Sequence, residues 1–160
     1  MEIERKFLLK EVPENLDRYS FHTIEQAYLN TKPVVRIRRE DDTYYLTYKG
    51  SGLMTHEEYN LPLDKTSYEH LREKADGRII RKKRYLIPLS QDEINSACYE
   101  QLNHTALTIE LDIFEGDLAP LVLAEIEFPN EEAAFAYEMH PMFAEDVTSD
   151  PKYHNSNMIN

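Results

Sequence analysis

Charged residues two positions apart recur along this chain of 160 residues, and each pair alternates with apolar or aromatic residues. The pattern begins in the first seven residues, where Glu2, Glu4 and Lys6 share one phase. It returns at Arg36 and Arg38, Lys82 and Arg84, Glu110 and Asp112, and Glu125 and Glu127. Because successive side chains of a strand point to opposite faces, each segment predicts a strand with one charged face. Like charges on one face repel unless a cation, a basic neighbour or water lies beside them, so the recurrence indicates a shared charged surface.

The composition limits the classes of protein to which this chain can belong. With 160 residues, of which 41% are hydrophobic, residues 1–160 are expected to form a single domain. A net charge of -12 argues against a general nucleic-acid or anionic membrane surface. The charged amino end lacks the apolar core of a signal peptide, and no apolar run approaches the roughly 20 residues of a membrane span. The single cysteine, Cys98, permits no internal disulfide and is expected to be a buried thiol in the reducing cytoplasm.

The alternation and the turn residues together predict a chain rich in strands. The expected strands cover 2–9, 21–29, 33–40, 43–49, 55–63, 78–89, 106–115 and 121–128. Short helices are expected at 13–19, at 64–76 with Gly77 as its end, at 91–103 and at 130–139, with a tail of loop and a short terminal helix over 140–160. The 91–103 helix would begin with a capping box at Ser90 and Glu93 and would form an insertion between two strands.

The short connections between successive strands favour a mostly antiparallel sheet in an α+β fold. The apolar phase of each strand must be covered. If the helices cover it from outside, the charged phase lines the inside of a curved or closed sheet, which reverses the arrangement of a small packed barrel. The sequence therefore predicts a water-filled, charge-lined tunnel.

The segment Glu2–Lys6 resembles the ExExK signature of the CYTH family, the triphosphate tunnel metalloenzymes. Further motifs follow in family order: residues 26–29 (QAYL), 36–38 (RIR), 46–49 (LTYK), 82–85 (KKRY), 110–112 (ELD), 125–127 (EIE) and 146–148 (DVT). The resemblance covers nearly the whole chain except 90–104 and is to the short, stand-alone bacterial members. It implies a closed, eight-stranded antiparallel barrel, a divalent metal and triphosphate substrates.

The basic residues suit a triphosphate, which carries several negative charges and develops more on the leaving oxygen during hydrolysis. Arginines offer forked contacts and lysines mobile point charges. The expected substrate-binding residues are Lys6, Arg36, Arg38, Lys49, Lys82 and Arg84. Lys82 is also expected to be catalytic, together with Glu2 and Tyr28, and the family's Gln-x-Tyr-Leu context directs Tyr28 toward the tunnel.

Carboxylates beside such a substrate make sense as ligands for Mg²⁺ or Mn²⁺, which take oxygen donors and bridge to phosphate. The expected ligands are Glu4, Glu125 and Glu127 for an ion that engages the phosphates, and Glu2, Glu58 and Asp112 for a second ion or an oriented water. Glu110 is expected instead to hold a neighbouring basic residue.

One departure from the family pattern is Asn60, which stands where a second glutamate often follows Glu58. The segment His56–Asn60 also resembles half of a zinc HExxH motif, but the second histidine is missing and the period is that of a strand, so zinc is discounted. The six histidines show no ligand-pair spacing, and most are expected on the surface or in turns. Lys152 is read as a surface lysine, with a phosphate contact at the tunnel mouth as the alternative.

The leading function is the divalent-metal-dependent hydrolysis of a linear triphosphate, with inorganic tripolyphosphate giving diphosphate and phosphate. Three alternatives stay open: a class IV-type adenylyl cyclase, a thiamine triphosphatase and a non-catalytic polyphosphate-binding module. The expected partner is the small anionic substrate alone, without nucleic acid or membrane, and a homodimer is left open. The chain has neither a Walker loop nor a Rossmann fingerprint.

Overall fold

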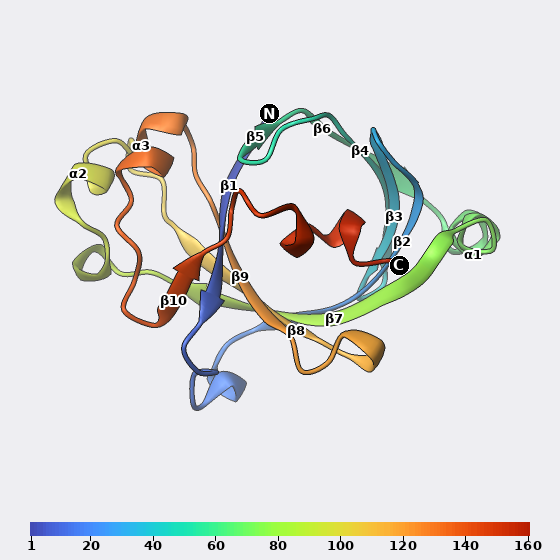
Figure 1. Ribbon diagram of the computed structural model, residues 1–160, viewed down its shortest axis with the longest axis horizontal. Helices are drawn as coiled ribbons and strands as arrows, with labels where there is room; N and C mark the ends of the chain where they lie inside the picture. Colours follow the sequence, from blue (N-terminus) through green and yellow to red (C-terminus); the bar gives the residue numbers. More distant parts are fainter.

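A computed structural model describes residues 1–160 and contains ten strands, three short α-helices and five single 3₁₀ turns (Figure 1). The strands are β1 (Glu2–Leu9), β2 (Phe21–Thr31), β3 (Val34–Glu40), β4 (Thr43–Lys49), β5 (Thr55–His56), β6 (Glu58–Leu63), β7 (Asp76–Pro88), β8 (Thr108–Phe114), β9 (Val122–Glu127) and β10 (Phe143–Asp146). The helices are α1 (Lys65–Arg72), α2 (Ser96–Tyr99) and α3 (Glu131–Ala136). The 3₁₀ turns are η1 (Leu16–Arg18), η2 (Gln91–Glu93), η3 (Gly116–Leu118), η4 (Pro151–Tyr153) and η5 (Asn155–Asn157). The longest helix, α1, has eight residues, and no helix has the length and apolarity that a membrane crossing requires.

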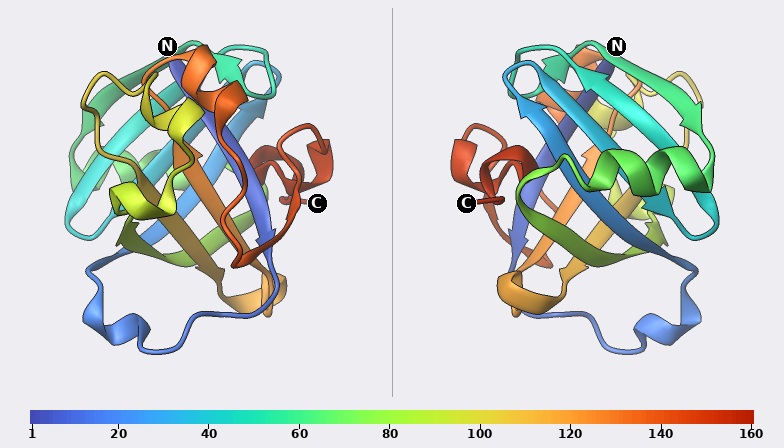
Figure 2. Two further views of the ribbon diagram at one scale, coloured as in Figure 1. Left: turned by 90° about the vertical axis from the view of Figure 1, so that its left-hand side faces the viewer. Right: turned by 90° about the vertical axis from the view of Figure 1, so that its right-hand side faces the viewer.

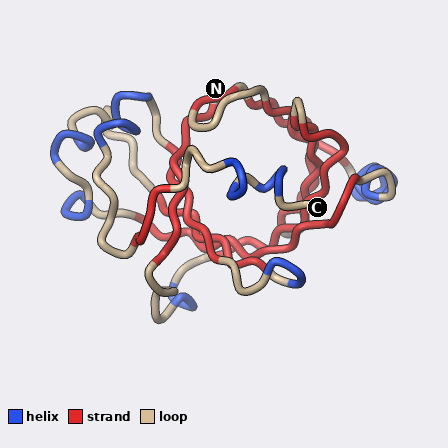
Figure 3. Tube along the Cα trace, in the orientation of Figure 1, coloured by secondary structure: helices blue, strands red, loops and turns tan.

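All paired strands are antiparallel and follow the order β10-β1-β9-β8-β7-β2-β3-β4-β6. The free side of β1 is shared, because β5 pairs with its first residues and β10 with its last. Since β5 and β6 are separated only by Glu57, this segment joins β1 to β4 and curls the sheet into a nearly closed barrel. The ring of strands is seen end-on in Figure 3. The antiparallel barrel expected from the sequence is thus confirmed, with the 55–63 strand split in two.

Two of the three apolar clusters lie on the outward phase of the strands. The short helices α1, α2 and α3 lie outside the ring of strands (Figure 1). On one side, Phe7, Leu111 and Ile126 pack with residues of the α2 and α3 region in a core of 15 buried residues. Cys98 is free and buried within this core. On the opposite side of the barrel, Tyr68 of α1 packs on Ala27 and Ile37. Removal of these apolar side chains from water stabilises the barrel from outside. On the inward phase, Ile80, Phe114 and Leu123 pack with Met158 and Ile159 in a second buried cluster, so charged groups line only part of the interior.

All four expected helices are shorter or broken in the structure: the 13–19 helix is reduced to η1, and the 130–139 helix ends at Ala136. Helix α1 ends at Arg72, so Gly77 does not end it but lies in β7 with φ +65°. A Cβ on Gly77 would lie 2.3 Å from the carbonyl oxygen of Ile159, so glycine permits the approach of the C-terminus. The expected 91–103 helix is broken into η2 and α2. Asn95 is extended there because its side chain donates to the Ala136 carbonyl at 2.8 Å and accepts from the Glu138 amide at 2.8 Å.

The tail contains strand β10, where only loop and a short terminal helix were expected. Phe143 stacks on Phe7 with 4.4 Å between ring centroids, and Asp146 accepts from Arg5 at 2.6 Å. Residues 147–160, called the C-terminal strap below, then cross one mouth of the barrel as turns η4 and η5 rather than a helix. The two side views in Figure 2 show the strap at one end of the barrel.

Candidate active site

The barrel encloses a cavity of about 660 Å³ whose wall carries charged residues from most of the strands. The structure brings most of the expected site residues to this wall: Glu2, Glu4, Lys6, Tyr28, Arg36, Arg38, Lys49, Glu58, Lys82, Arg84, Glu110 and Glu125. Asp112 and Glu127 are not part of the wall. The alternation of side chains along each strand explains why these residues share the cavity wall, because the side chains of one phase all point to the concave face of the sheet.

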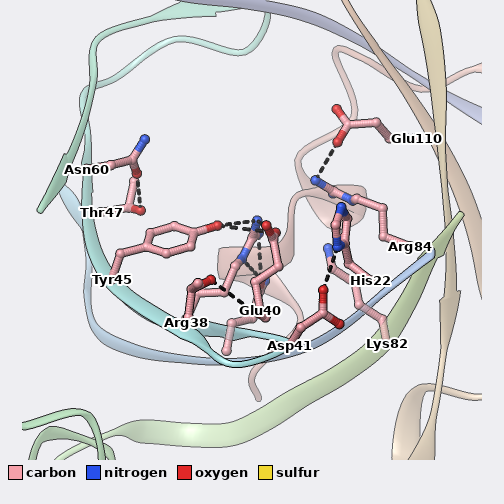
Figure 4. Close-up of polar contacts among 12 residues, drawn as sticks. His22, Arg38, Glu40, Asp41, Tyr45, Thr47, Asn60, Lys82, Arg84 and Glu110 are labelled. Atoms are coloured by element: carbon pink, nitrogen blue, oxygen red, sulfur yellow. Dashed lines mark hydrogen bonds and ion pairs between the residues drawn. The ribbon is translucent and has the colours of Figure 1, made fainter. Parts of the chain in front are cut away.

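Two arginines of β3 carry positive charge that no close carboxylate neutralises. Arg38 donates from Nε and Nη2 to Oε1 of Gln26, at 3.0 and 2.7 Å, and its nearest carboxylate, Glu40, lies 3.9 Å away (Figure 4). Arg36 donates to the Thr47 hydroxyl at 3.2 Å, while its buried Nε has no partner. A buried donor without an acceptor is costly, so this pair of arginines favours an anionic ligand in the cavity.

Lys82 and Arg84 of β7 share one carboxylate, that of Asp112 in β8. Lys82 Nζ lies 2.7 Å from Oδ2, and Arg84 donates from Nε to Oδ1 at 2.8 Å and from Nη2 to Oδ2 at 2.9 Å. Burial lowers the pKa of Lys82 to about 7, even though Asp112 attracts its proton. Both oxygens of Asp112 are occupied by these cations and the side chain is fully buried, so the structure gives it a positioning contact in place of the expected metal contact.

Two more carboxylates form ion pairs with basic residues on the side of the cavity where Lys82 and Arg84 lie, called the basic side below. Glu125 lies 3.3 Å from Lys6 Nζ and 3.4 Å from Arg84 Nη2. Although burial acts to raise the pKa of Glu125, Lys6 and Arg84 hold it well below its usual range. Glu110 accepts from Arg84 Nη1 at 2.9 Å, which is the basic neighbour expected for it (Figure 4). These ion pairs fix the side chains of Lys6 and Arg84.

Glu4 lies among other carboxylates and has no ion pair. Burial, and after it the nearby Glu125 carboxylate, raise the pKa of Glu4 to about 8. Glu127 stands directly opposite Glu4 in the β1–β9 ladder, more exposed, and burial followed by the charge of Glu2 raises its pKa as well. Crowded carboxyl groups form a set of oxygen donors whose mutual repulsion a divalent cation would offset, and hard Mg²⁺ and Mn²⁺ fit such donors.

A second group of donors comprises Glu2, His56 and Glu58, whose ligand atoms lie within 4.8 Å of one another. His56 Nε2 is 2.5 Å from Glu2 Oε1, and Lys49 Nζ is 2.9 Å from the same oxygen. Burial acts to raise the pKa of Glu2, but the hydrogen bond to His56 and the other contacts outweigh it and lower the pKa. In Glu58, burial and the contact with Glu2 raise the pKa. The carboxylate oxygens of this group suit both Mg²⁺ and Mn²⁺, and the imidazole nitrogen favours Mn²⁺ over Mg²⁺.

His56 is a functional candidate that sequence reasoning missed. The sequence predicts most histidines on the surface or in turns, but His56 is buried and its Nδ1 has no partner. Its partner Glu2 comes from β1, so no spacing rule within the chain could reveal the pair. The usable signal was its position two residues before Glu58, in the same phase.

Asn60 occupies the expected phase but does not replace the glutamate as a charged group. Its Oδ1 accepts from the Thr47 hydroxyl at 2.5 Å (Figure 4). Its Nδ2 donates to Glu58 at 3.3 Å. Asn60 therefore orients Glu58 and links it to the Thr47 side of the cavity.

The C-terminal strap adds polar atoms to the wall that the sequence did not indicate. Lys6 Nζ donates to the Tyr153 carbonyl at 3.1 Å, and Lys82 Nζ donates to Asn155 Oδ1 at 3.0 Å. Lys152 is exposed and outside the cavity wall, with its ammonium over the Tyr153 ring, as expected for a surface lysine. Tyr28 is almost fully buried, and its hydroxyl accepts from Gln26 Nε2 at 3.3 Å.

The sequence and the fold of this chain are both similar to those of known proteins. The CYTH domain family model matches residues 1–137. An inorganic triphosphatase of Nitrosomonas europaea is 35% identical over 159 residues, covering 96% of this chain and 93% of that protein. An inorganic triphosphatase of Acetivibrio thermocellus is 31% identical over 164 residues, covering 99% and 92%. A crystal structure of an inorganic triphosphatase superposes with a TM-score of 0.68 at 33% identity, covering 99% of this chain and 94% of that one.

Proposed function

Because this chain belongs to the CYTH family, we propose that it hydrolyses a linear inorganic triphosphate, with tripolyphosphate giving diphosphate and phosphate. The observation that carries this proposal is the pair Arg36 and Arg38 in the cavity wall. Arg36 has no carboxylate partner, and the one carboxylate near Arg38, that of Glu40, lies 3.9 Å away. Other carboxylates crowd a different part of the same wall. The two arginines favour an anionic ligand, and the crowded carboxylates favour a cation. A polyphosphate chain bound with a divalent metal supplies both.

The substrate-binding roles follow the charge of each wall residue. Arg36 and Arg38 bind phosphoryl oxygens with their guanidinium groups, which Gln26 and Thr47 hold in place. The remaining contacts come from the cations that are themselves held by carboxylates, namely Lys6, Lys49, Lys82 and Arg84. Such held cations need little reorganisation when charge develops on the phosphoryl group.

The carboxylates are proposed as ligands of Mg²⁺ or Mn²⁺ in two groups. Glu4 and Glu127, with Glu125 beside them, form the group nearest the basic side, and Glu2 and Glu58 form the other. A bound divalent ion would neutralise phosphoryl charge and lower the pKa of water. Asp112 is left out of this set because its oxygens bind Lys82 and Arg84.

Three residues are proposed to act on the reacting atoms. Lys82 stabilises the oxygen that leaves when the bridging P–O bond breaks, since its ammonium is held at the cavity wall by Asp112. Glu2 orients the attacking water, and the Tyr28 hydroxyl contacts a phosphoryl oxygen from the same wall. The water oxygen forms the new bond to phosphorus, and its proton leaves with the products.

The composition of the wall favours this reaction over cyclisation of ATP. Of the 26 residues that line the cavity, four are hydrophobic: Tyr28, Val34, Tyr48 and Leu53. A cyclase must hold a base and a ribose so that one hydroxyl faces the α-phosphate, which calls for an apolar base pocket. Charged groups suited to phosphate and metal dominate this wall instead.

The test is a substrate panel of tripolyphosphate, ATP and thiamine triphosphate, assayed with Mg²⁺, with Mn²⁺ and with EDTA. We expect metal-dependent phosphate release, a higher kcat/KM for tripolyphosphate than for ATP, and no cyclic AMP. Cyclic AMP in proportion to enzyme would replace the hydrolase by the cyclase. A preference for thiamine triphosphate would change the substrate. Binding of tripolyphosphate without turnover in either metal would leave a polyphosphate-binding module.

A further inference from the structure

The side chain of Asn155 lies at the cavity wall beside Lys82, although the residue belongs to the C-terminal strap. We propose that Asn155 is a further substrate-binding residue whose side-chain NH₂ donates a hydrogen bond to the phosphoryl group bound at Lys82. This inference rests on the proposed function and adds to it a neutral donor from outside the barrel strands.

The contacts of Asn155 determine which way its amide points. Its Oδ1 accepts from Lys82 Nζ at 3.0 Å and from Gln26 Nε2 at 3.0 Å. A lysine ammonium has donors only, so the oxygen of the amide must face Lys82. The opposite edge, Nδ2, donates to no protein atom and belongs to a residue of the cavity wall. An anion that enters beside Lys82 therefore meets an oriented and available N–H donor.

Gln26 connects this position to the arginine that faces the anion. Its Oε1 accepts from Arg38 Nε and Nη2, so its Nε2 is the edge that remains for Asn155. Asn155, Gln26 and Arg38 thus form a chain of hydrogen bonds in which each amide orientation is dictated by a cation at one end. The donor of Asn155 is consequently preorganised, which reduces the ordering cost of binding.

The strap is held firmly enough to present this donor. Met158 and Ile159 are buried against Tyr28 and Ile80. The Arg78 amide donates to the Ile159 carbonyl at 2.7 Å, close to Gly77. At its other end, the Val147 amide donates to the Lys6 carbonyl at 2.8 Å. Anchors on both sides of the mouth place residues 153–155 against the lysines between them.

Two substitutions separate a substrate contact from a purely structural role. Asn155→Ala removes the donor and the oxygen that Lys82 contacts. Asn155→Asp has the same shape and still accepts from Lys82 and Gln26, but it lacks the donor and adds a negative charge. Lys152→Ala is the matched control, because this residue lies on the same strap outside the cavity wall.

The measurements are the dissociation constant of tripolyphosphate in EDTA by titration calorimetry, kcat and KM for phosphate release with Mg²⁺, and the thermal midpoint. For Asn155→Ala we expect binding weaker by roughly 10-fold to 100-fold, since a hydrogen bond to a charged group contributes about 1.5–3 kcal/mol. KM should rise more than kcat falls. Asn155→Asp should bind more weakly still at an undiminished thermal midpoint, while Lys152→Ala should match the wild type.

Wild-type affinity in Asn155→Asp would overturn the inference, and so would unchanged affinity in Asn155→Ala. If Asn155→Ala fails to fold, Asn155→Leu takes its place, because it keeps the size of the side chain, lacks the donor and adds no charge; wild-type affinity in that variant would overturn the inference. Failure of the proposed function is distinguishable, because it would show as absent phosphate release by the wild type in both metals. The calorimetric comparison in EDTA would then still test Asn155 as an anion contact.

Discussion

The ammonium group of Lys82 lies 2.7 Å from Asp112 Oδ2, and both side chains are almost completely excluded from solvent, at 1% and 0% exposure. Arg84 binds the same carboxylate through two nitrogens. Asp112 does not line the cavity, so it neutralises two buried cations of the cavity wall from outside that wall. This arrangement leaves the tunnel with cations whose positions are set before any phosphate arrives.

Asp112→Asn should destabilise the fold. The amide preserves the shape but leaves Lys82 and Arg84 with less compensating charge, and breaking a buried ion pair costs about 3–5 kcal/mol. Urea denaturation measures the loss in free energy of unfolding. Asp117→Asn, at an exposed turn, is the control and should change stability by less than about 0.5 kcal/mol. Equal stability of both variants would contradict the role given to Asp112.

Arg36→Met should weaken substrate binding without weakening the fold. The buried Nε of Arg36 has no partner, so removing the guanidinium also removes an unsatisfied donor and the repulsion of Arg38. We expect KM for tripolyphosphate to rise roughly 10-fold or more, as for a lost charged hydrogen bond. The thermal midpoint should stay level or rise. Arg39→Met, on the outer face of the same strand, should leave KM unchanged, and a fall in stability for Arg36→Met would argue against the account.

Glu4→Gln should abolish most of the metal-dependent turnover while the protein stays folded. The substitution replaces a carboxyl group that can release its proton to a divalent cation by an amide that cannot become charged, which lowers affinity for the cation, while the shape of the side chain is kept. Titration of activity with Mg²⁺ should show a higher half-saturating concentration. Glu127→Gln should behave in the same direction. Glu57→Gln, in the opposite phase of the 55–63 segment, serves as control, and wild-type activity of Glu4→Gln at limiting Mg²⁺ would reject the assignment.

His56→Gln should change the preference between metals. An imidazole nitrogen contributes more to Mn²⁺ than to Mg²⁺, which favours oxygen donors. The half-saturating concentration of Mn²⁺ should therefore rise more than that of Mg²⁺. His70→Gln, exposed on α1, should alter neither value. Parallel changes for both metals would mean that His56 acts only by holding Glu2.

Glu25→Gln should reduce stability in a pH-dependent way. Glu25 accepts from Arg72 and Tyr68 at 2.8 Å each and from Arg81 at 3.1 Å, which ties α1 to the barrel. Burial acts to raise the pKa of Glu25, but the contacts with Arg72 and Tyr68 outweigh it and lower the pKa below 4.5.

A carboxyl with a lowered folded-state pKa stabilises the fold above its unfolded pKa and loses that contribution as pH falls through the folded value. The free energy of unfolding of the wild type should thus exceed that of Glu25→Gln by about 1 kcal/mol at pH 7, and this difference should disappear below pH about 4. Urea titrations at several pH values measure the difference. Glu69→Gln, an exposed residue of α1, should show no such pH dependence, and a constant difference for Glu25→Gln would refute the linkage.

Local periodicity in the sequence was sufficient to predict every strand region except β10, and the face on which the charges of the predicted strands lie. The alternation around Lys6, Arg38 and Glu125 depends only on neighbouring residues, so the charged phase and its place inside an antiparallel barrel could be predicted. The buried state of Cys98 was expected from the general preference of a free cysteine for the interior.

Tertiary structure alone decided which charges meet. Asp112 turns both oxygens to Lys82 and Arg84, His56 meets Glu2 across 54 positions, and Asn155 reaches Lys82 across 73. These partners depend on strand register and on where the C-terminal strap crosses the mouth, and both are set by the packing of the whole barrel. A period of two specifies the face of a strand but not the residue opposite, because that choice requires distant segments to be held at fixed positions by the shared core.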